Sequence, residues 1–305
     1  MRVFITGASG FVGSAVVAEL LRAGHRVLGL ARSDGAAQSI SSAGADVQRG
    51  SLDDLDSLRD AAAASDAVIH TAFIHDFANF AASAEADKRA IETLGAALEG
   101  SGRPLIVTAG TSVHITRGGG VATESDMPDP GFPRVSEQTA QPFCERGVRV
   151  SVMRLPPSVH GAGDHAFIPR LIGIAREKGV SAYVGDGRNR WASVHRLDAA
   201  VLYRLAIESE AAGTILHAVG DEGVPMREIA TVIGRRLNVP VTSVEPHEAA
   251  EHFGFLGLFA GADLAASGAI TSERFGWKPV HPGLLADLDS NAYFPVSDAH
   301  REVPA

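Results

Sequence analysis

Three glycines at positions 7, 10 and 13 are the residues whose type and spacing have the clearest chemical meaning. They lie in the run Thr6-Gly7-Ala8-Ser9-Gly10-Phe11-Val12-Gly13, between an apolar strand candidate and an apolar helix candidate. Glycine permits a tight turn and lets a diphosphate approach the backbone, and the first turn of a helix offers N–H groups to its charge. A glycine triplet in this setting predicts a bound dinucleotide, with a purely structural turn as the alternative.

The residues after the second expected strand bear on which dinucleotide is bound. A basic residue there accepts the 2′-phosphate of NADP, whereas an acidic residue hydrogen-bonds the ribose 2′-hydroxyl of NAD. Arg32 and Ser33 follow this strand directly, and a guanidinium can pair with a phosphate through two donors, so the sequence favours NADP. Asp34 lies at the usual distance for NAD, but we place it in a polar loop before Gly35. NAD, and a solvated Arg32, are the alternatives.

Asp53 is a further candidate for nucleotide contact, because it follows the third expected strand in Gly50-Ser51-Leu52-Asp53. A carboxylate at this point can accept a hydrogen bond from the exocyclic amine of adenine. It can equally cap the helix expected over 54–64. Both interpretations stay open from the sequence.

Polar residues also follow the fourth and fifth expected strands, where parallel sheets bind their ligands. After the fifth strand, the hydroxyls of Thr111 and Ser112 can stabilise a developing oxyanion, and His114 can donate a proton near neutral pH. After the fourth, His75 and Phe77 suit a substrate pocket within the run His75-Asp76-Phe77-Ala78-Asn79-Phe80. A packing role for His114, a cap at Asp76 and a core position for Phe80 are the alternatives.

Short apolar runs alternate with helical stretches through the first half of the chain, which predicts a Rossmann-type, doubly wound parallel sheet of the α/β class. The expected strands are Arg2–Thr6, Arg26–Ala31, Asp46–Gln48, Ala67–Thr71, Leu105–Thr108 and Val148–Leu155. The expected helices between them are Ser14–Arg22, Asp54–Ala64 and Asn79–Leu98.

The alternation loosens after Pro156, which suggests a second structural unit. There we expect helices over Phe167–Lys178 and Leu197–Ile207, a strand over Thr214–Val219 and a small hairpin over Tyr183–Val194. We therefore predict a Rossmann domain over 1–160, to which 195–220 contribute. A smaller C-terminal substrate-binding lobe would be formed by 161–194 and 221–305. In this lobe, Phe253–Phe259 can line an apolar substrate pocket, form a dimer seam or belong to a helical core.

Composition narrows the classes of partner. The 305 residues carry a formal net charge of −9 and no basic stripe, so nucleic acid is not an expected partner. Cys144 is the single cysteine, expected as a buried apolar residue, and no spacing of a known metal site occurs, so we expect no metal. The first strand begins at Arg2 and no stretch is long enough to span a bilayer. We expect a cytoplasmic protein without membrane contact, as a monomer or homodimer, acting on a small molecule.

Five segments, in order along the chain, carry a family resemblance: Thr6–Gly13, Gly50–Asp53, Val68–Ala72, Arg154–Gly161 and Trp191–Ala200. Together they resemble an extended short-chain dehydrogenase/reductase, in the NAD(P)-dependent epimerase/dehydratase-like group. The segments span most of the chain, so the resemblance implies both the fold and the cofactor of that superfamily.

The resemblance also implies roles for individual residues. The pyrophosphate would be held by Gly7, Ser9, Gly10, Phe11, Val12 and Gly13. The ribose side would be lined by Thr71, Ala72 and Phe73, and the nicotinamide would be flanked by Thr108, Pro156, Pro157, Ser158 and Val159. His195 and Asp198 would be structural. His160 and His165 can reach the active cleft or be loop histidines without a role.

The chain departs from the superfamily in its catalytic pair. The usual chemistry relies on Tyr-x-x-x-Lys, in which the lysine lowers the tyrosine pKa so that the phenol can exchange a proton with the substrate. The three tyrosines, at 183, 203 and 293, are followed four residues later by Gly187, Ile207 and Ser297. The expected region, 133–139, contains neither residue type. The resemblance is therefore to an atypical branch.

These observations predict an NADP-dependent oxidoreductase that moves a hydride between the cofactor and a small organic carbonyl, enone or imine. The reacting carbon would lie near Phe73, Thr111 and His114, and the proton would come from an unusual donor or from water. Because the catalytic pair is missing, a dinucleotide-binding sensor without catalysis is the alternative. A polar cavity beside the nicotinamide would favour the enzyme.

Overall fold

The computed structural model describes residues 1–76, 78–111 and 120–294. Its main element is a seven-stranded sheet in the order β10-β6-β5-β4-β1-β2-β3, and every neighbouring pair is parallel. The strands are β1 Arg2–Thr6, β2 Arg26–Ala31, β3 Asp46–Arg49, β4 Ala67–His70, β5 Pro104–Gly110, β6 Arg149–Leu155 and β10 Thr214–His217. The chain winds outward in both directions from β1 and β4, which confirms the Rossmann-type sheet.

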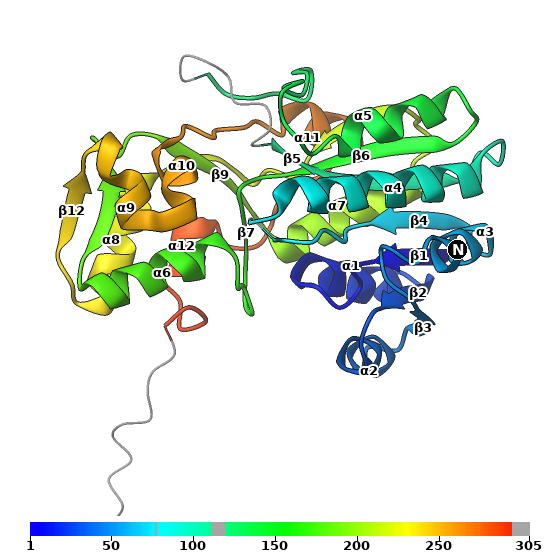
Figure 1. Cartoon of the computed structure of the whole chain (residues 1–305), viewed down its shortest axis with the longest axis horizontal. Coiled ribbons are helices and arrows are strands. Elements are labelled where there is room, and N and C mark those ends of the chain that lie inside the picture. Colours follow the sequence, from blue (N-terminus) through cyan, green and yellow to red (C-terminus); the bar gives the residue numbers. More distant parts are fainter. Residues whose placement is uncertain (77, 112–119, 295–305) are drawn as a thin grey trace, which may run out of the picture.

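Helices cover both faces of this sheet (Figure 1). One face carries α1 Phe11–Arg22, α2 Asp34–Ser42 and α7 Arg196–Glu208. The other carries α3 Leu55–Ala63, α4 Phe80–Leu98, α5 Ser136–Ala140 and the short 3-10 helix η2 Gln141–Cys144. Side chains of β1 alternate between the two faces, with Val3 and Ile5 in the first core and Phe4 in the second.

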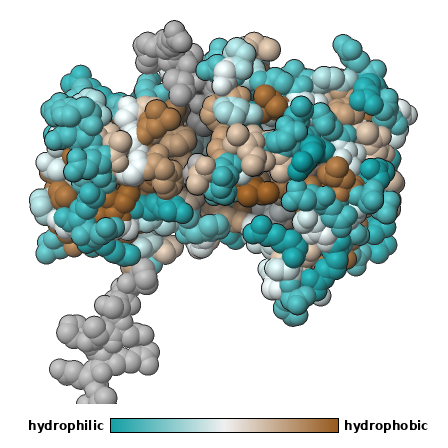
Figure 2. Space-filling model, in the orientation of Figure 1, coloured by the Kyte–Doolittle hydropathy of each residue, from teal (hydrophilic) through white to brown (hydrophobic). Residues whose placement is uncertain are grey.

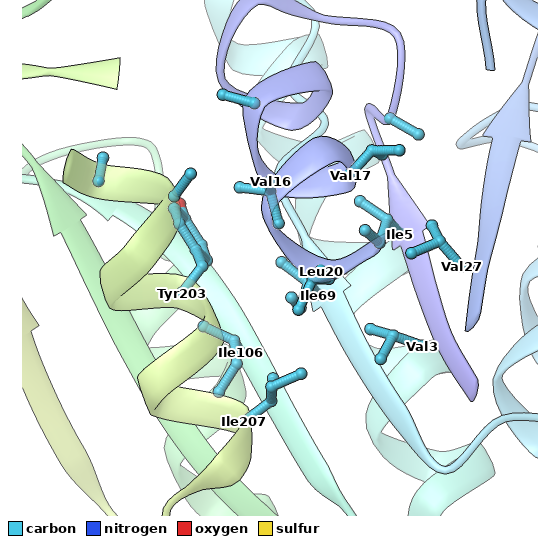
Figure 3. Close-up of a cluster of buried hydrophobic side chains, with 14 of the residues drawn as sticks. Val3, Ile5, Val16, Val17, Leu20, Val27, Ile69, Ile106, Tyr203 and Ile207 are labelled. Atoms are coloured by element: carbon cyan, nitrogen blue, oxygen red, sulfur yellow. The ribbon is translucent and has the colours of Figure 1, made fainter. Parts of the chain in front are cut away.

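Figure 3 shows the first of these cores, where Val16 and Leu20 of α1 and Tyr203 of α7 pack over the sheet. All three are at most 2% exposed, so the core holds α1 firmly against β1. The half-buried Cys144 packs against the second core. The core beneath α1 matters for function because it fixes the helix whose first turn follows the glycine run.

The remaining elements form a second part, at the left of Figure 1. Its strands are β7 Ser158–His160, β8 Ser181–Val184, β9 Arg190–His195, β11 Asp221–Pro225 and β12 Val241–Val244. Its helices are α6 Phe167–Lys178, α8 Met226–Leu237, η3 Pro246–Glu248, α9 Ala249–Phe253, η4 Gly254–Leu256, α10 Gly257–Gly261 and α12 Leu284–Leu288, while α11 Ala269–Phe275 packs against β10. A separate hydrophobic cluster, from 167 to 294, lies inside it.

The prediction of a hairpin over Tyr183–Val194 is wrong. β8 pairs in parallel with β12, while β9 lies between β7 and β11. The glycines at 185 and 187 do form a turn, but it separates two strands that belong to different sheets. All four residues of β8 are buried, so pairing with a distant strand covers it better than a local partner would.

The apolar run Phe253–Phe259 divides between the interior and the surface. Phe253 and Leu256 are buried in the hydrophobic cluster of the second part, whereas Phe255 and Leu258 are 41% and 76% exposed. Figure 2 shows hydrophobic residues toward the middle of the molecular face and hydrophilic residues along its outer edges. In the described part of the chain, no helix is long and apolar enough to cross a membrane.

Candidate cofactor and active site

The glycine run forms a closely packed turn between β1 and α1. Gly7 has φ +71°, and a Cβ there would lie 2.8 Å from both the backbone nitrogen of Ala72 and Oγ1 of Thr71. A Cβ on Gly13 would overlap the carbonyl oxygen of Gly7. Gly10 closes the turn, because its N–H donates to Gly7 O at 2.9 Å. Positions 7 and 13 require glycine, and the turn brings backbone amides to an open edge.

The first turn of α1 lacks the side-chain caps that the neighbouring helices α2 and α3 have. Gly10 is its N-cap and provides no side-chain hydrogen bond, and the first turn contains no acidic residue. By contrast, Ser33 caps α2 and Asp54 caps α3 through their side chains. Ser9 and Gly10 are exposed, so the N–H groups of the first α1 turn face a position that an anion can reach.

The structure corrects two predictions beside this turn. Asp34 is not in a polar loop, because it is the first residue of α2, which Ser33 caps by accepting a hydrogen bond from Ala36 N at 3.2 Å. Its carboxylate pairs with Arg49 at 2.7 Å. The cap proposed for Asp53 belongs to Asp54, and Asp53 instead pairs with Arg89.

Arg32 is exposed at the carboxyl end of β2. In the described part of the chain it has no hydrogen bond or ion pair, unlike Arg26 at the start of β2, which lies 3.6 Å from Asp46. A phosphate at this corner of the sheet would therefore not compete with a carboxylate for Arg32. Ser33 lies next to it, with its oxygen already engaged at the α2 cap.

The residues after β4 are fixed by hydrogen bonds to β1. Thr71 Oγ1 donates to the carbonyl of Thr6 at 2.7 Å, and Ala72 N donates to Thr6 Oγ1 at 3.3 Å. Farther along the sheet, the hydroxyls of Thr108 and Tyr203 hydrogen-bond at 2.7 Å in the core. The Thr108 hydroxyl is therefore turned toward α7.

A buried chain of hydrogen bonds links Thr6 to the region where the catalytic pair was expected. Thr6 Oγ1 lies 2.8 Å from His70 Nδ1, and His70 Nε2 lies 3.1 Å from Asp87 Oδ1. The Ser136 hydroxyl donates to the other oxygen of Asp87. Burial by itself would raise the pKa of Asp87, but Arg134, His70 and Ser136 bring it below the usual value. Asp87 is thus an ionised carboxylate at 1% exposure.

Arg134 is the residue that the sequence reasoning missed. Its Nη2 donates to Thr108 O at 2.8 Å, its Nε donates to Ser136 Oγ at 2.9 Å, and Asp87 lies 3.5 Å away. The guanidinium also lies over the ring of Phe73, 4.0 Å from its centre. A small pocket beside it, at the carboxyl end of β5, is lined by Ala109, Gly110, Pro128, Arg134, Ser136, Glu137 and Gln138. The only signal in the sequence was a basic residue within 133–139.

Two predicted site residues have buried hydroxyls that find no hydrogen-bond partner among the described residues. They are Thr111, directly after β5, and Ser158, at the start of β7. Leaving a buried hydroxyl unpaired costs about 1–3 kcal/mol, so a ligand that hydrogen-bonds either hydroxyl would gain affinity from it. Next to Ser158, Pro156 is buried and Val159 is half-buried.

The structure describes some of the residues predicted to contact the substrate and not others. Phe77, Ser112 and His114 lie outside the described residues. His75 is edge-on to Phe73 at 5.2 Å, and desolvation together with the nearby Arg134 lowers its pKa. His160 is turned toward the second part, with Nδ1 2.7 Å from Asp287.

His165 and Arg196, which are distant in sequence, both pack against Phe11 at the start of α1. The His165 ring is edge-on at 5.8 Å, and the Arg196 guanidinium lies 4.9 Å from the ring centre. No local pattern indicated that Arg196 lies beside the glycine run. Its cation near the first turn of α1 adds to the attraction for a diphosphate.

His195, Asp198 and His281 lie close enough for three ligand atoms to fall within 4.8 Å of one another, which their spacing did not reveal. Asp198 already accepts hydrogen bonds from the backbone nitrogens of Val280 and His281 and pairs with the His281 ring at 2.8 Å. His195 caps α7 and stacks on His281 with the ring planes 11° apart. The ring nitrogens of stacked imidazoles point along parallel planes, so we interpret the group as a structural link between α7 and 280–281.

Comparison with known proteins now identifies the relationship that these features suggest. The model of the NAD dependent epimerase/dehydratase family matches residues 3–219. The chain belongs to this family. It is therefore an NAD(P)-dependent enzyme of the oxidoreductase type, which confirms the expected superfamily and enzyme class.

Family members differ in how much is known of them. The chain is 52% identical to the uncharacterized protein C2A9.02 of Schizosaccharomyces pombe, over 96% of this chain and 100% of that one. It is 27% identical to the 4-hydroxy-2-methyl-3-oxo-4-farnesyl-3,4-dihydroquinoline-1-oxide ketoreductase of Stigmatella aurantiaca, over 83% and 80% of the two chains. In fold it matches DesIV, a dTDP-glucose 4,6-dehydratase of Streptomyces venezuelae solved with NAD and TYD, at TM-score 0.77, 21% identity and 95% coverage of both chains.

Proposed function

We propose that this family member is an NADP-dependent oxidoreductase that transfers a hydride to or from a small organic carbonyl, enone or imine. The observation that carries the proposal is the first turn of α1, which follows a glycine turn and has no side-chain cap. A diphosphate there would accept hydrogen bonds from the N–H groups and gain from the helix dipole. Arg32, which no carboxylate engages in the described part of the chain, supports the 2′-phosphate of NADP over the hydroxyl of NAD.

The chain's residues fit such a cofactor along its whole length. Gly7, Ser9, Gly10, Phe11, Val12 and Gly13 would hold the pyrophosphate, Arg32 and Ser33 the 2′-phosphate, and Asp53 the adenine. Thr71, Ala72 and Phe73 would line the ribose side, and the nicotinamide would lie between Thr108 and the Pro156–Val159 segment. The unpartnered Ser158 hydroxyl supports a polar ligand at that end. Bound NADPH supplies the hydride, and the protein supplies position and charge stabilisation.

The tyrosines support a mechanism without the usual phenol. Tyr203 is buried against Thr108, and the Tyr293 hydroxyl donates to Asp164 at 2.8 Å. Burial raises the pKa of both hydroxyls, which makes them poorer acids. Tyr183 lies in the hydrophobic cluster of the second part, beneath Arg227. None of the three tyrosines lines the pocket beside β5, so the proton of the reaction would come from water or a group other than tyrosine.

We further propose that residues 1–160 with 195–220 bind the cofactor and that 161–194 with 221–305 bind the substrate. The separate hydrophobic cluster inside the second part supports this division. His75, His160 and the predicted Phe77 and Ser112 would contact the substrate, with Thr111 and His114 at the reacting carbon. The similarity to the ketoreductase of Stigmatella aurantiaca supports a carbonyl as the substrate.

Initial activity would be measured as NADPH oxidation with acetophenone, ethyl 3-oxobutanoate, 2-cyclohexen-1-one and 1-pyrroline as probes. We expect turnover of at least one of them and a higher affinity for NADPH than for NADH. If NADPH binds but a broad panel of such compounds gives no turnover, hydride transfer to these substrate classes is excluded.

Replacing Arg32 with serine tests the cofactor preference. We expect NADPH to bind about 10- to 100-fold more weakly and NADH to be unaffected, because hydrogen bonds to a charged group contribute about 1.5–3 kcal/mol. Isothermal titration with both nucleotides would measure this. Arg26→Ser, at the opposite end of β2, is the matched control and should change neither affinity. An equal loss for both nucleotides would place Arg32 away from the 2′ position.

Replacing Thr111 with valine separates a functional hydroxyl from a structural one. The hydroxyl is buried without a hydrogen-bond partner in the described residues, so its removal should leave the free energy of unfolding unchanged or slightly increased. Turnover should fall about 10-fold or more, because a donor at the reacting oxygen is lost. Denaturant unfolding and steady-state rates measure the two effects. A clear loss of stability with normal turnover would assign the hydroxyl to the fold.

A further inference from the structure

We infer that Arg134 binds the substrate oxygen and stabilises the negative charge that develops on it, in the place of the missing tyrosine. The inference rests on the proposed function, because it concerns the same hydride transfer. Arg134 would be the group that polarises the substrate. The favoured substrates would then be those whose reacting carbon is double-bonded to oxygen.

Arg134 is held in one orientation by groups on three sides. Its Nη2 and Nε donate to Thr108 O and Ser136 Oγ, and the face of the guanidinium lies on the Phe73 ring. A guanidinium fixed in this way loses little conformational freedom when it forms another hydrogen bond. Pre-organisation of this kind is what charge stabilisation in a transition state requires.

One nitrogen of Arg134 remains available. Nη1 has no hydrogen-bond partner among the residues that the structure describes, although the side chain is only 16% exposed. Arg134 lines the pocket at the carboxyl end of β5, and Thr111, with its unpartnered hydroxyl, follows that strand directly. Two donors that have no acceptor among the described residues therefore occur at the end of one strand, where ligands of parallel sheets bind.

The positive charge of Arg134 is offset by a nearby carboxylate. Asp87, its counter-ion at 3.5 Å, also accepts hydrogen bonds from His70 and Ser136, so its negative charge is shared among three partners. The site is therefore close to neutral before reaction, which suits an uncharged carbonyl. As the oxygen becomes negative, its attraction to the fixed guanidinium grows, so the transition state gains more than the bound substrate.

The chemical step is reduction of the carbonyl by NADPH. The hydride adds to the carbonyl carbon, the electron pair of the C=O π bond moves to oxygen, and NADPH becomes NADP⁺. The resulting alkoxide is held by Nη1 of Arg134 and then takes a proton from water, which leaves hydroxide in the solvent. Arg134 donates a hydrogen bond to the alkoxide and transfers no proton.

The first test compares kinetics of Arg134→Gln with the wild-type protein, on a probe ketone that the wild type reduces. We expect kcat to fall about 100-fold or more, with KM and NADPH affinity changed less than about threefold, because the lost interaction forms mainly in the transition state. An unchanged kcat would overturn the inference but leave the proposed function in place. A wild-type protein that reduces only the imine would overturn the inference alone, and one that reduces none of the four probes would overturn both.

A double variant controls for the unpaired Asp87. Arg134→Gln combined with Asp87→Asn removes both charges, and Asp87→Asn alone keeps the guanidinium. At a temperature where all variants are folded, we expect the double variant to stay about 100-fold slower than Asp87→Asn alone. Equal rates for these two would show that Arg134 acts only through the ion pair, which would overturn the inference.

A second measurement needs no turnover. Phenylglyoxal modifies accessible arginines, and peptide mass spectrometry can follow each site separately. In the wild-type protein with NADP⁺, we expect saturating acetophenone to slow modification of Arg134 about 10-fold, because the ketone oxygen would occupy Nη1. Arg32 should be protected by NADP⁺ alone and serve as the internal control. No additional protection of Arg134 by the ketone would contradict binding of the substrate oxygen.

Discussion

Replacing Gly13 with alanine is expected to abolish measurable NADPH binding and to lower the free energy of unfolding by about 3 kcal/mol or more. The new Cβ would overlap the carbonyl oxygen of Gly7 and lie 2.8 Å from its carbonyl carbon. Both are backbone atoms, so no side-chain rotation can relieve the overlap. Either the turn or the start of α1 must move, and the N–H groups proposed to bind the pyrophosphate move with it.

Two measurements check this result: denaturant unfolding for stability and isothermal titration for NADPH. Gly35→Ala is the matched control, because a Cβ on Gly35 in α2 would meet nothing within 4 Å. That variant should bind NADPH normally, and its stability should be unchanged or slightly higher because alanine favours a helix. If Gly13→Ala bound NADPH with wild-type affinity, the glycine turn would not be the pyrophosphate site.

Local sequence patterns predicted the central sheet well, because its strands, apart from the exposed edge strand β3, are mostly short apolar runs buried on both faces. The bounds of β1 and β2 agree with the prediction, and those of the other central strands differ by a few residues at their ends. α2 was missed because only Ala37 and Ile40 of its nine residues are buried, so it has a weak apolar face. Its start was nonetheless visible as a serine cap at Ser33 followed by an acid.

The pairing of β8 and β9 illustrates a limit of local patterns. A turn with two glycines suggests a hairpin, but β8 pairs with β12, which lies about 60 residues away. Such pairing depends on which edges the rest of the fold leaves exposed, and this is decided by tertiary packing. The residues around 183–194 do not by themselves indicate which strand edges are exposed.

The glycine turn could be predicted because its residues are adjacent in the chain, whereas the Arg134 network could not. Asp87 is one polar residue on a long amphipathic helix, where a charge usually faces solvent. Its ion pair with Arg134 joins residues 47 positions apart, and its contact with His70 crosses from α4 to β4. Arg134 therefore gains a role only when α4, α5 and β4 are placed together. The roles of Phe77, Ser112 and His114 stay predictions.

Replacing Asp87 with asparagine is expected to lower the free energy of unfolding by about 3–5 kcal/mol at neutral pH. Asparagine can still hydrogen-bond His70 and Ser136, but it provides no charge to balance Arg134. The loss is large because Asp87 is 1% exposed, so the remaining guanidinium cannot be compensated by solvent at that side. Urea unfolding of both proteins at several pH values measures the difference.

The pH dependence of this difference has a definite sign. The folded protein holds the pKa of Asp87 below its usual range, which is about 4 in the unfolded chain. A depressed folded pKa contributes stability that is complete above the unfolded pKa and is lost as pH falls through the folded one. The difference between wild type and Asp87→Asn should therefore be constant above about pH 5 and shrink below about pH 4.

A surface aspartate supplies the control. Asp56, which pairs with Arg59 on α3, has a side chain that is 86% exposed, so Asp56→Asn should change stability by less than about 1 kcal/mol. If Asp87→Asn changed the free energy of unfolding as little as Asp56→Asn, the Asp87 carboxylate would not balance Arg134 in the folded protein. A difference that grew as the pH fell would show that Asp87 is protonated at neutral pH, and Arg134 would then carry an unbalanced charge at the proposed reaction site.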